Sequence, residues 1–181
     1  MMRISYTAIV ACISVLWILA RVWCWHKAKK ISLRRELELI PVYICLIVVA
    51  RFTFCPFGKV DGRIQPLLFD PARVFPPRIN LVPLVNLLDY AISREALVNV
   101  AGNTAMFIPI GVIWPCAYRK LDKAWKVIAA GVGLSLTVEI LQLPFFDRVT
   151  DIDDLLLNSL GFLIGYGIYA VAKRIKKKSS V

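Results

Sequence analysis

Histidine is nearly absent from this chain, and closely spaced cysteine pairs are absent altogether. His26 is the only histidine, and none of the five cysteines belongs to a Cys-x-x-Cys pair. Zinc sites take several His or Cys ligands at short spacings, and disulfide frameworks take regularly spaced cysteines. A Ser-His or Cys-His nucleophile pair is not visible either. The sequence therefore predicts no metal site, no cofactor and no disulfide scaffold.

Acidic residues are also scarce compared with basic ones. Twelve Asp and Glu stand against 23 Lys and Arg, which gives a formal net charge of +11. In a soluble protein this excess would suggest a nucleic-acid partner. Here the basic residues gather between long apolar runs, which is typical of membrane topology signals. We therefore expect the membrane as a partner, and no nucleic acid.

The apolar runs themselves are long. Of the 181 residues 59% are hydrophobic, a share outside the soluble range. At about 1.5 Å per helical residue, each run can cross a hydrocarbon core of about 30 Å. The sequence predicts an all-α, polytopic helical membrane protein that forms a single membrane domain over residues 1–181. The expected spans are residues 4–25, 39–57, 96–114, 126–146 and 153–172, followed by a basic tail at 173–181.

The distribution of basic residues predicts which way the spans run. With five spans, one side of the membrane carries 14 Lys and Arg in its loops and tail, and the other carries 7. The side with more basic residues is normally cytoplasmic. We expect a multi-pass protein of the bacterial cytoplasmic membrane with its N-terminus outside and its C-terminus in the cytoplasm. The long connection over residues 58–95 then lies outside.

Part of that long connection is apolar. Residues 79–92 read INLVPLVNLLDYAI, interrupted by Pro83 and Asn86. The interruptions make a full span unfavourable, so an interfacial or re-entrant segment is predicted.

Polar residues interrupt the last three predicted spans on one helical face each. An ionisable side chain inside a membrane is costly and is a functional hypothesis by default. Two stripes run from small residues at the cytoplasmic end to polar residues at the outer end. The stripes are Gly131, Ser135, Glu139 and Gln142 on the fourth span and Asp154, Asn158, Gly161 and Gly165 on the fifth, with Asn99 and Asn103 on the third.

Estimated depths place these polar groups at one level. Glu139 and Asn103 lie about 10 Å below the outer surface, and Arg51 on the second span lies at about 9 Å. We therefore expect a polar cavity that opens outward and is closed by tightly packed helices on the cytoplasmic side. Structural readings stay open: a buried Arg51–Glu139 ion pair, amides that only bridge helices, and Thr150 as a helix N-cap with Asp153 in the first turn.

Four motifs resemble one family. RINLVPL (78–84), NVAGNTAMFIPIG (99–111), SLTVEILQ (135–142) and DRVTDIDDLLLNSLGFLIGY (147–166) resemble, in order and spacing, the VanZ-like membrane proteins. Phe162 stands where many members have a second glycine, and Leu84 where Phe is common. The resemblance covers residues 78–170 and implies a small polytopic envelope protein of bacteria. The family's namesake raises resistance to the glycopeptide teicoplanin.

The resemblance also implies which positions form the site. With Arg51 from the depth argument, the ligand-binding set is Arg78, Asn80, Asn99, Asn103, Glu139, Gln142, Asp151, Asp154 and Asn158. The first hypothesis is an accessory envelope protein that binds an anionic amphiphile, such as a lipid-linked cell-wall component or an acyl-tailed glycopeptide. Arg63, Arg73 and Arg78 would hold its phosphate or carboxylate.

Two other function classes stay open. An intramembrane enzyme acting on a lipid headgroup would use Glu139 for acid-base work and Asp154 to orient a water. A divalent cation held by Asp151, Asp154 and Glu139 is a variant of that hypothesis. A transporter would relay protons through Glu139 and Arg51, although no inverted repeat is visible.

Overall fold

The fold is helical and built for a membrane. The computed structural model describes residues 2–54, 59–60, 63–64, 66–83, 94–121, 123–146 and 148–179. Within these residues five helices are long and apolar enough to cross a membrane. The predicted class, an all-α polytopic helical membrane protein, is confirmed. The chain divides into two compact units, Met1–Asp70 and Pro71–Val181, and the prediction of one membrane domain stays a prediction.

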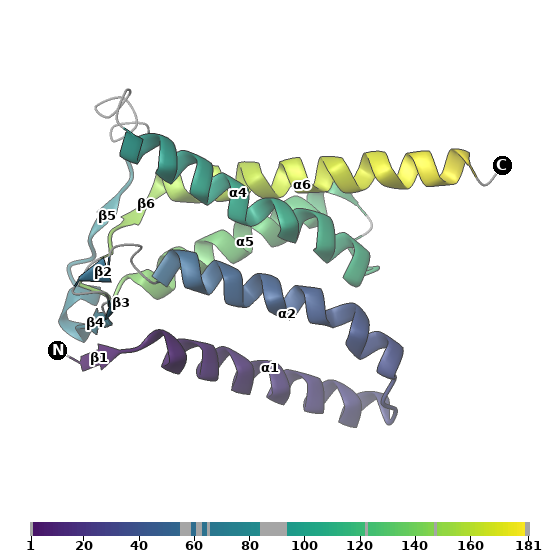
Figure 1. The fold of residues 1–181 in the computed structure, drawn as a ribbon, viewed down its shortest axis with the longest axis horizontal. Coiled ribbons are helices and arrows are strands. Elements are labelled where there is room, and N and C mark those ends of the chain that lie inside the picture. The colour runs from purple at the N-terminus through teal and green to yellow at the C-terminus, as the bar shows by residue number, and fades with distance from the viewer. Residues whose placement is uncertain are drawn as a thin grey trace. The chain divides into compact units, whose positions relative to one another are not determined.

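The first unit is a helical hairpin with short strands at its ends (Figure 1). Its elements are β1 (Met2–Ile4), α1 (Tyr6–Ala28), α2 (Leu33–Phe54), β2 (Lys59–Val60), β3 (Arg63–Ile64) and β4 (Leu67–Phe69). Strand β1 pairs antiparallel with β4, and β2 pairs antiparallel with β3. Ser5 begins α1 as its N-cap, because its side chain accepts the N–H of Ala8 at 3.2 Å. The hairpin thus has a defined start and a β pair that returns the chain to it.

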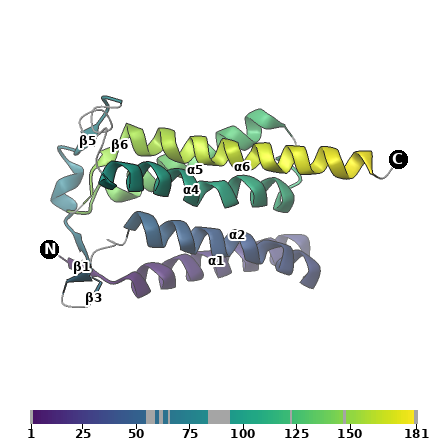
Figure 2. The same ribbon diagram turned by 45° about the horizontal axis from the view of Figure 1, so that its top comes forward.

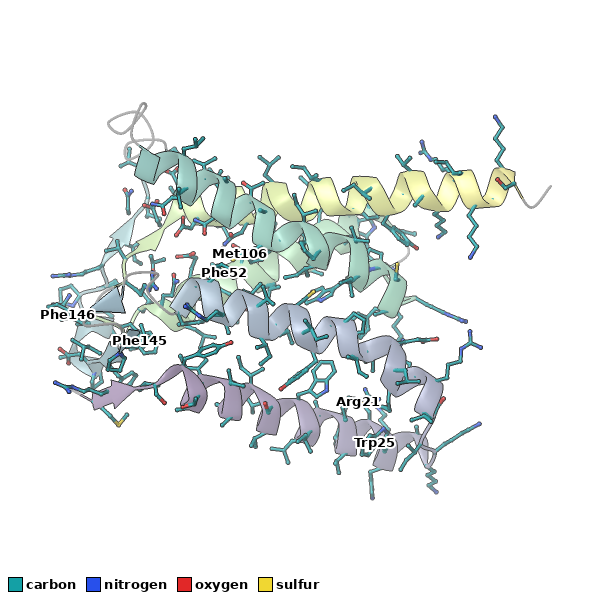
Figure 3. All side chains as sticks on the ribbon, viewed as in Figure 1. Arg21, Trp25, Phe52, Met106, Phe145 and Phe146 are labelled. Atoms are coloured by element: carbon teal, nitrogen blue, oxygen red, sulfur yellow. The ribbon has the colours of Figure 1, made fainter. Side chains whose placement is uncertain are left out.

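Polar side chains join α1 to α2. The Nε and Nη2 atoms of Arg21 donate to the carboxylate of Glu36 at 2.9 and 2.6 Å, and Nε1 of Trp25 donates to it at 2.8 Å (Figure 3). Farther along the hairpin the hydroxyls of Ser14 and Tyr43 are 2.7 Å apart. The Glu36 contacts explain why α2 begins at Leu33, six residues before the predicted span. Much of the expected basic loop is therefore helical.

The second unit is a three-helix bundle closed at one end by a pair of parallel strands (Figure 2). Its elements are η1 (Pro71–Val74), β5 (Ile79–Asn80), α4 (Arg94–Ala117), α5 (Ala124–Gln142), β6 (Thr150–Asp151) and α6 (Ile152–Lys178). Helix α6 packs extensively along α4 and also along α5, whereas α4 and α5 touch each other little. Helix α6 is therefore the element around which this unit is arranged.

Glycines bring α6 and α4 into backbone contact. A Cβ atom on Gly161 would overlap the carbonyl oxygen of Thr104, and one on Gly165 would overlap that of Ile108 and lie 2.9 Å from the Cα of Gly111. Small residues allow such approach in membranes, where lipid tails are as apolar as the side chains and packing must hold the helices together. The expectation of tight packing at the glycine ends of the stripes is confirmed.

Phe162 fits the same interface although it departs from the family pattern. Its ring is buried and lies against Gly131 of α5, where an added Cβ would come within 2.5 to 2.9 Å of the ring. On the other side the ring of Trp114 meets it edge-on, with centroids 5.8 Å apart. Because Gly131 has no side chain, α5 leaves room for the ring of Phe162 on α6.

The last three spans differ from their predicted bounds at their ends. Helix α5 ends at Gln142, four residues before the predicted end, because Pro144 has no N–H to continue the helical pattern. Helix α6 continues to Lys178, so most of the predicted basic tail is helical. Of the predicted interfacial segment, residues 79–80 form β5, and residues 84–92 lie outside the described residues.

Replacing Gly165 with alanine should destabilise the second unit. The new Cβ would meet backbone atoms of α4 that cannot move aside, and overpacking of this kind costs about 1–3 kcal/mol. Gly167→Ala, two residues later on the same helix, is the matched control, because nothing lies within 4 Å of its Cβ position. Thermal unfolding of both variants in detergent tests this. Equal midpoints for the two would contradict the backbone contact.

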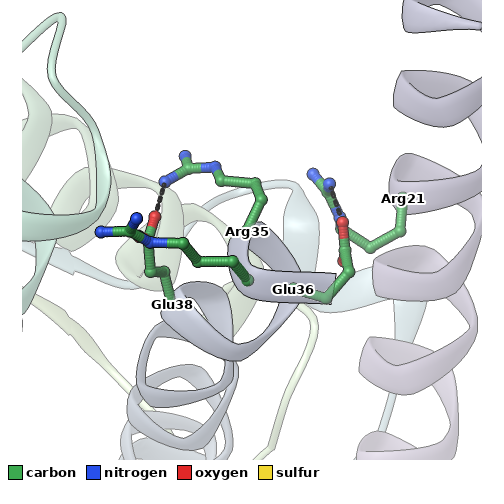
Figure 4. A network of polar contacts seen from close by, with 5 residues as sticks. Arg21, Arg35, Glu36 and Glu38 are labelled. Carbon is green, nitrogen blue, oxygen red and sulfur yellow. Dashed lines mark hydrogen bonds and ion pairs between the residues drawn. The ribbon is translucent and has the colours of Figure 1, made fainter. Parts of the chain in front are cut away.

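Replacing Glu36 with alanine should destabilise the first unit more than Glu38→Ala. Glu36 accepts three hydrogen bonds from the other helix, and charged hydrogen bonds are worth about 1.5–3 kcal/mol. Glu38 only pairs with Arg34 and Arg35 of its own helix at 3.3 Å, and exposed pairs contribute about 0–1 kcal/mol (Figure 4). Denaturation curves of the two variants provide the comparison. A larger loss for Glu38→Ala would overturn it.

Candidate functional site

Polar side chains from five elements lie at the end of the second unit where α5 ends and α6 begins. We call this set the polar cluster: Asn80 of β5, Asn103 of α4, Glu139 of α5, Asp151 of β6 and Asp154 of α6. Hydrogen bonds join Asn80 to Asp151, the backbone of Asp151 to Glu139, and Asn103 to Asp154. The labelled strands β5 and β6 and the start of α6 lie together at one end of this unit (Figure 1).

Strands β5 and β6 form the outer edge of the polar cluster. They run parallel, with Ile79 opposite Thr150 and Asn80 opposite Asp151. The N–H of Thr150 donates to the carbonyl oxygen of Arg78 at 3.1 Å. The side-chain amide of Asn80 donates to both carboxylate oxygens of Asp151, at 3.3 and 3.2 Å. Residues 78–80 are thereby fixed to the turn that precedes α6.

Glu139 holds β6 at the end of α5. Only 2% of its surface is exposed. Its Oε2 atom accepts the backbone N–H of Asp151 at 3.2 Å, and its carbonyl oxygen accepts the hydroxyl of Thr150 at 3.0 Å. A buried carboxylate is costly unless it is hydrogen-bonded, so these contacts compensate for its burial. The negative charges of Asp154 and Asp151 also act on it.

Asp151 begins helix α6. As the N-cap residue it accepts the N–H of Asp153 at 3.0 Å through Oδ1. The prediction that Thr150 is the N-cap is wrong, because Thr150 lies in β6 and its hydroxyl is used by the carbonyl of Glu139. Asp153 does lie in the first turn, as predicted, together with Asp154. The carboxylates of this turn therefore have different roles.

Asp154 faces another helix. Its Oδ1 atom accepts a hydrogen bond from the side-chain amide of Asn103 on α4. Both residues are partly exposed, in contrast to Glu139. The positive charge of Arg148 and the negative charge of Asp151 act on the Asp154 carboxylate. Asn80 and Asp151 are partly exposed too, so Glu139 is the one buried member of the polar cluster.

One turn farther along α6 the polar cluster is closed by a buried pair. The side-chain amide of Asn158 donates to the hydroxyl of Ser135 on α5 at 3.0 Å, and the two residues are 1% and 0% exposed. Among the described residues Oδ1 of Asn158 finds no hydrogen-bond partner. Beyond this pair the α6 stripe continues with Gly161 and Gly165, which leave no room between the helices.

The structure bears out the two predicted stripes as buried faces. On α5 all four stripe residues are buried, including Gln142. On α6 Asn158 and both glycines are buried, and Asp154 is partly exposed. The buried face of each helix is thus the one that the i, i+4 spacing predicts. A cavity among these residues stays a prediction.

Other predicted site residues are not drawn into the polar cluster by their side chains. Asn99, one turn before Asn103, is exposed. Arg78 reaches the polar cluster through its carbonyl oxygen, and its side chain is exposed. The guanidinium of Arg73 lies over the ring of Phe146, 3.7 Å from its centroid. Arg73 lies on η1, Arg78 directly precedes β5, and Asn99 lies on α4.

The remaining two predicted arginines, Arg51 and Arg63, belong to the first unit. Arg51 lies on α2 with its guanidinium 5.7 Å from the ring centroid of Tyr6, so its meeting with Glu139 stays a prediction. The side chain of Arg63 lies outside the described residues.

The structure gives no support to the divalent-cation variant. Among the residues that it describes, no three His, Cys, Asp or Glu side chains are grouped closely enough to hold a metal ion. Glu139, Asp151 and Asp154 influence one another electrostatically, and each already accepts a hydrogen bond from a side-chain amide or a backbone N–H.

Three residues of the site were not in the predicted set. Ser135 was predicted only as part of a stripe. Its position four residues before Glu139 places it on the same face of α5, and this face meets Asn158. Arg148 acts on Asp154 from the turn before β6. The hydroxyl of Thr150 had no signal in the sequence, because its acceptor is a backbone carbonyl.

Comparison with known proteins now adds to this geometry. A family model described as VanZ/LLP1 matches residues 42–173. Protein VanZ of Enterococcus faecium is 30% identical over 96 residues, which make up 53% of this chain and 55% of that protein. The matched part thus spans about half the length of this relative. No solved structure matches the chain. Because the family model covers well over half of the sequence, this multi-pass membrane protein belongs to the VanZ/LLP1 family.

Proposed function

We propose that this protein is an accessory protein of the bacterial cell envelope whose polar cluster binds the headgroup of an anionic amphiphile. The ligand class is a lipid-linked cell-wall component or an acyl-tailed glycopeptide. In this proposal the protein lies in the cytoplasmic membrane with its N-terminus outside, its C-terminus in the cytoplasm and the polar cluster in the outer half. Its contribution to the cell is increased tolerance of glycopeptides such as teicoplanin.

The observation that carries the proposal is the position of Arg78. Its backbone is fixed to β6 by the hydrogen bond from Thr150, and the next residues are fixed by the Asn80–Asp151 contact. Its guanidinium is exposed and makes no hydrogen bond or ion pair with a described side chain. A guanidinium held in place beside a polar site matches the two oxygens of a phosphate or carboxylate.

The neighbouring groups suit the rest of such a ligand. The partly exposed Asn103–Asp154 pair offers an amide and a carboxylate that can hydrogen-bond the hydroxyls of a sugar or the amides of a peptide. Apolar side chains are exposed on the same two helices, among them Leu97 and Val98 on α4 and Leu156 on α6. An acyl chain can lie along these side chains in the lipid while its headgroup stays at the polar cluster.

An intramembrane acid-base enzyme is the second candidate. The buried carboxyl of Glu139 close to Asp154 supports it, because proton transfer needs such groups near one another. Against it stands the structural task of Glu139, whose carboxylate already accepts the N–H of Asp151. Transport is supported least, since the stripes continue past Asn158 with glycines rather than with polar residues.

Arg78→Gln should weaken binding of an anionic amphiphile. Farnesyl diphosphate serves as the probe, and calorimetry on the purified protein in a non-ionic detergent measures its affinity. Loss of charged hydrogen bonds worth about 1.5–3 kcal/mol predicts a decrease of about tenfold or more. Arg119→Gln, in the turn between α4 and α5, is the matched control because it removes the same exposed charge elsewhere. Equal effects of both substitutions would mean non-specific attraction and would refute the site.

Glu139→Gln should separate binding from catalysis. The glutamine oxygen can still accept the N–H of Asp151, so the fold is expected to remain. A binding protein should keep a large part of its effect on teicoplanin tolerance in cells, whereas an acid-base enzyme should lose about 100-fold or more of its activity. Glu139→Leu and Asp154→Leu variants that fold and stay fully active would show that the polar cluster has no part in function.

A further inference from the structure

The segment around β5, residues 74–82, exposes its large apolar side chains. Phe75 is 85% exposed, Leu81 70% and Val82 58%, and Val74 and Ile79 are exposed as well. All five Val, Ile, Leu and Phe side chains between positions 74 and 82 are thus exposed. Exposed apolar groups of this density mark contact surfaces for a membrane or another protein.

The strand geometry directs part of this surface away from the polar cluster. Side chains alternate in direction along a strand. Asn80 points to Asp151, so its strand neighbour Ile79 lies on the opposite face. Ile79 and the next residue after the strand, Leu81, are both exposed. The segment therefore has a polar face turned to β6 and an apolar face turned outward.

The depth of the segment follows from its attachment to β6. Thr150 and Asp151 pair with Ile79 and Asn80, and helix α6, which is long and apolar enough to cross a membrane, begins at Ile152. Residues 78–80 are thus held at the level where α6 enters the bilayer. Irregular backbone is excluded from the hydrocarbon core because its polar groups would lack partners, so the segment belongs at the interface.

Charge complementarity identifies the surface that it meets. Arg78 lies within the segment with its side chain exposed, and residues 71–83 contain no acidic side chain. The neighbouring Arg73 differs, because its guanidinium lies over the ring of Phe146. Basic residues at this level are attracted to anionic lipid headgroups, while adjacent apolar side chains enter the acyl boundary.

We propose that residues 74–82 form a membrane-inserting loop that dips its apolar side chains into the leaflet at the end of the bundle where α6 begins. Arg78 lies at the level of the lipid phosphates. The loop anchors β5, and through it β6, to the membrane surface. This does not depend on which ligand the polar cluster binds.

Fluorescent labelling tests the loop. In a cysteine-free variant of the full chain, single cysteines at Phe75 and at Val82 are labelled with an environment-sensitive nitrobenzoxadiazole dye, and the protein is reconstituted in phosphatidylglycerol and phosphatidylcholine vesicles. Lys120→Cys, in the exposed turn between α4 and α5, is the control. At positions 75 and 82 the emission should shift to the blue and be mostly lost with lipid-borne quenchers. At position 120 the dye should respond to aqueous iodide instead.

Three results would overturn the loop. Dyes at 75 and 82 that are quenched by iodide as strongly as the control would place the segment in water. Blue-shifted emission that neither quencher affects would mean that protein covers the segment. A blue shift that disappears when the protein is diluted in lipid would mean that a second copy of the chain covers it. Circular dichroism of each labelled protein verifies that the helices have formed.

Discussion

The hydrogen bond from the backbone N–H of Asp151 to the carboxylate of Glu139 is the contact on which the second unit depends. A carboxylate buried near the end of a membrane-spanning helix needs a donor, and the turn after α5 provides one. The same turn residue pairs with Asn80 and caps α6. One residue therefore connects the end of α5, the start of α6 and the strand that precedes α4. The polar cluster is arranged around this connection.

Close packing is a second constraint, and it acts farther along α6 toward its C-terminus. Without a hydrophobic driving force between helices in lipid, association relies on van der Waals contact and on hydrogen bonds between helices. Helix α6 uses both in sequence: Asp154 to Asn103, Asn158 to Ser135, then Gly161 and Gly165 against the backbone of α4. Glycines bring α4 and α6 together where the polar pairs end. At the other end the side chains of Asn103 and Asp154 connect α4 and α6 instead.

The sequence predicted the helices and their buried faces well, since both depend on periodic patterns. Hydropathy located five spans, and the i, i+4 spacing identified the face of α5 that carries Glu139 and the face of α6 that carries Asn158. It did not predict the β5–β6 pair, because two strands of two residues have no alternation to detect. For the same reason the N-cap was assigned to Thr150 rather than to Asp151. The early start of α2 was missed because its cause, Glu36 binding Arg21, joins two helices.

The two carboxylates that the sequence singled out are not equivalent, and this bears on any chemistry at the site. Glu139 supports the turn that begins α6, because its side-chain oxygen accepts the N–H of Asp151. Asp154 has no such task. Its partner is a side-chain amide on another helix, and both are partly exposed, so it can exchange Asn103 for a ligand group while the backbone stays in place. In the proposed binding site Asp154 and Asn103 are therefore the exchangeable partners, and Glu139 is the fixed support. Substitutions of Asp154 or Asn103 are therefore expected to leave the backbone of this end in place, whereas a substitution of Glu139 that removes the acceptor oxygen is expected to loosen the turn that begins α6.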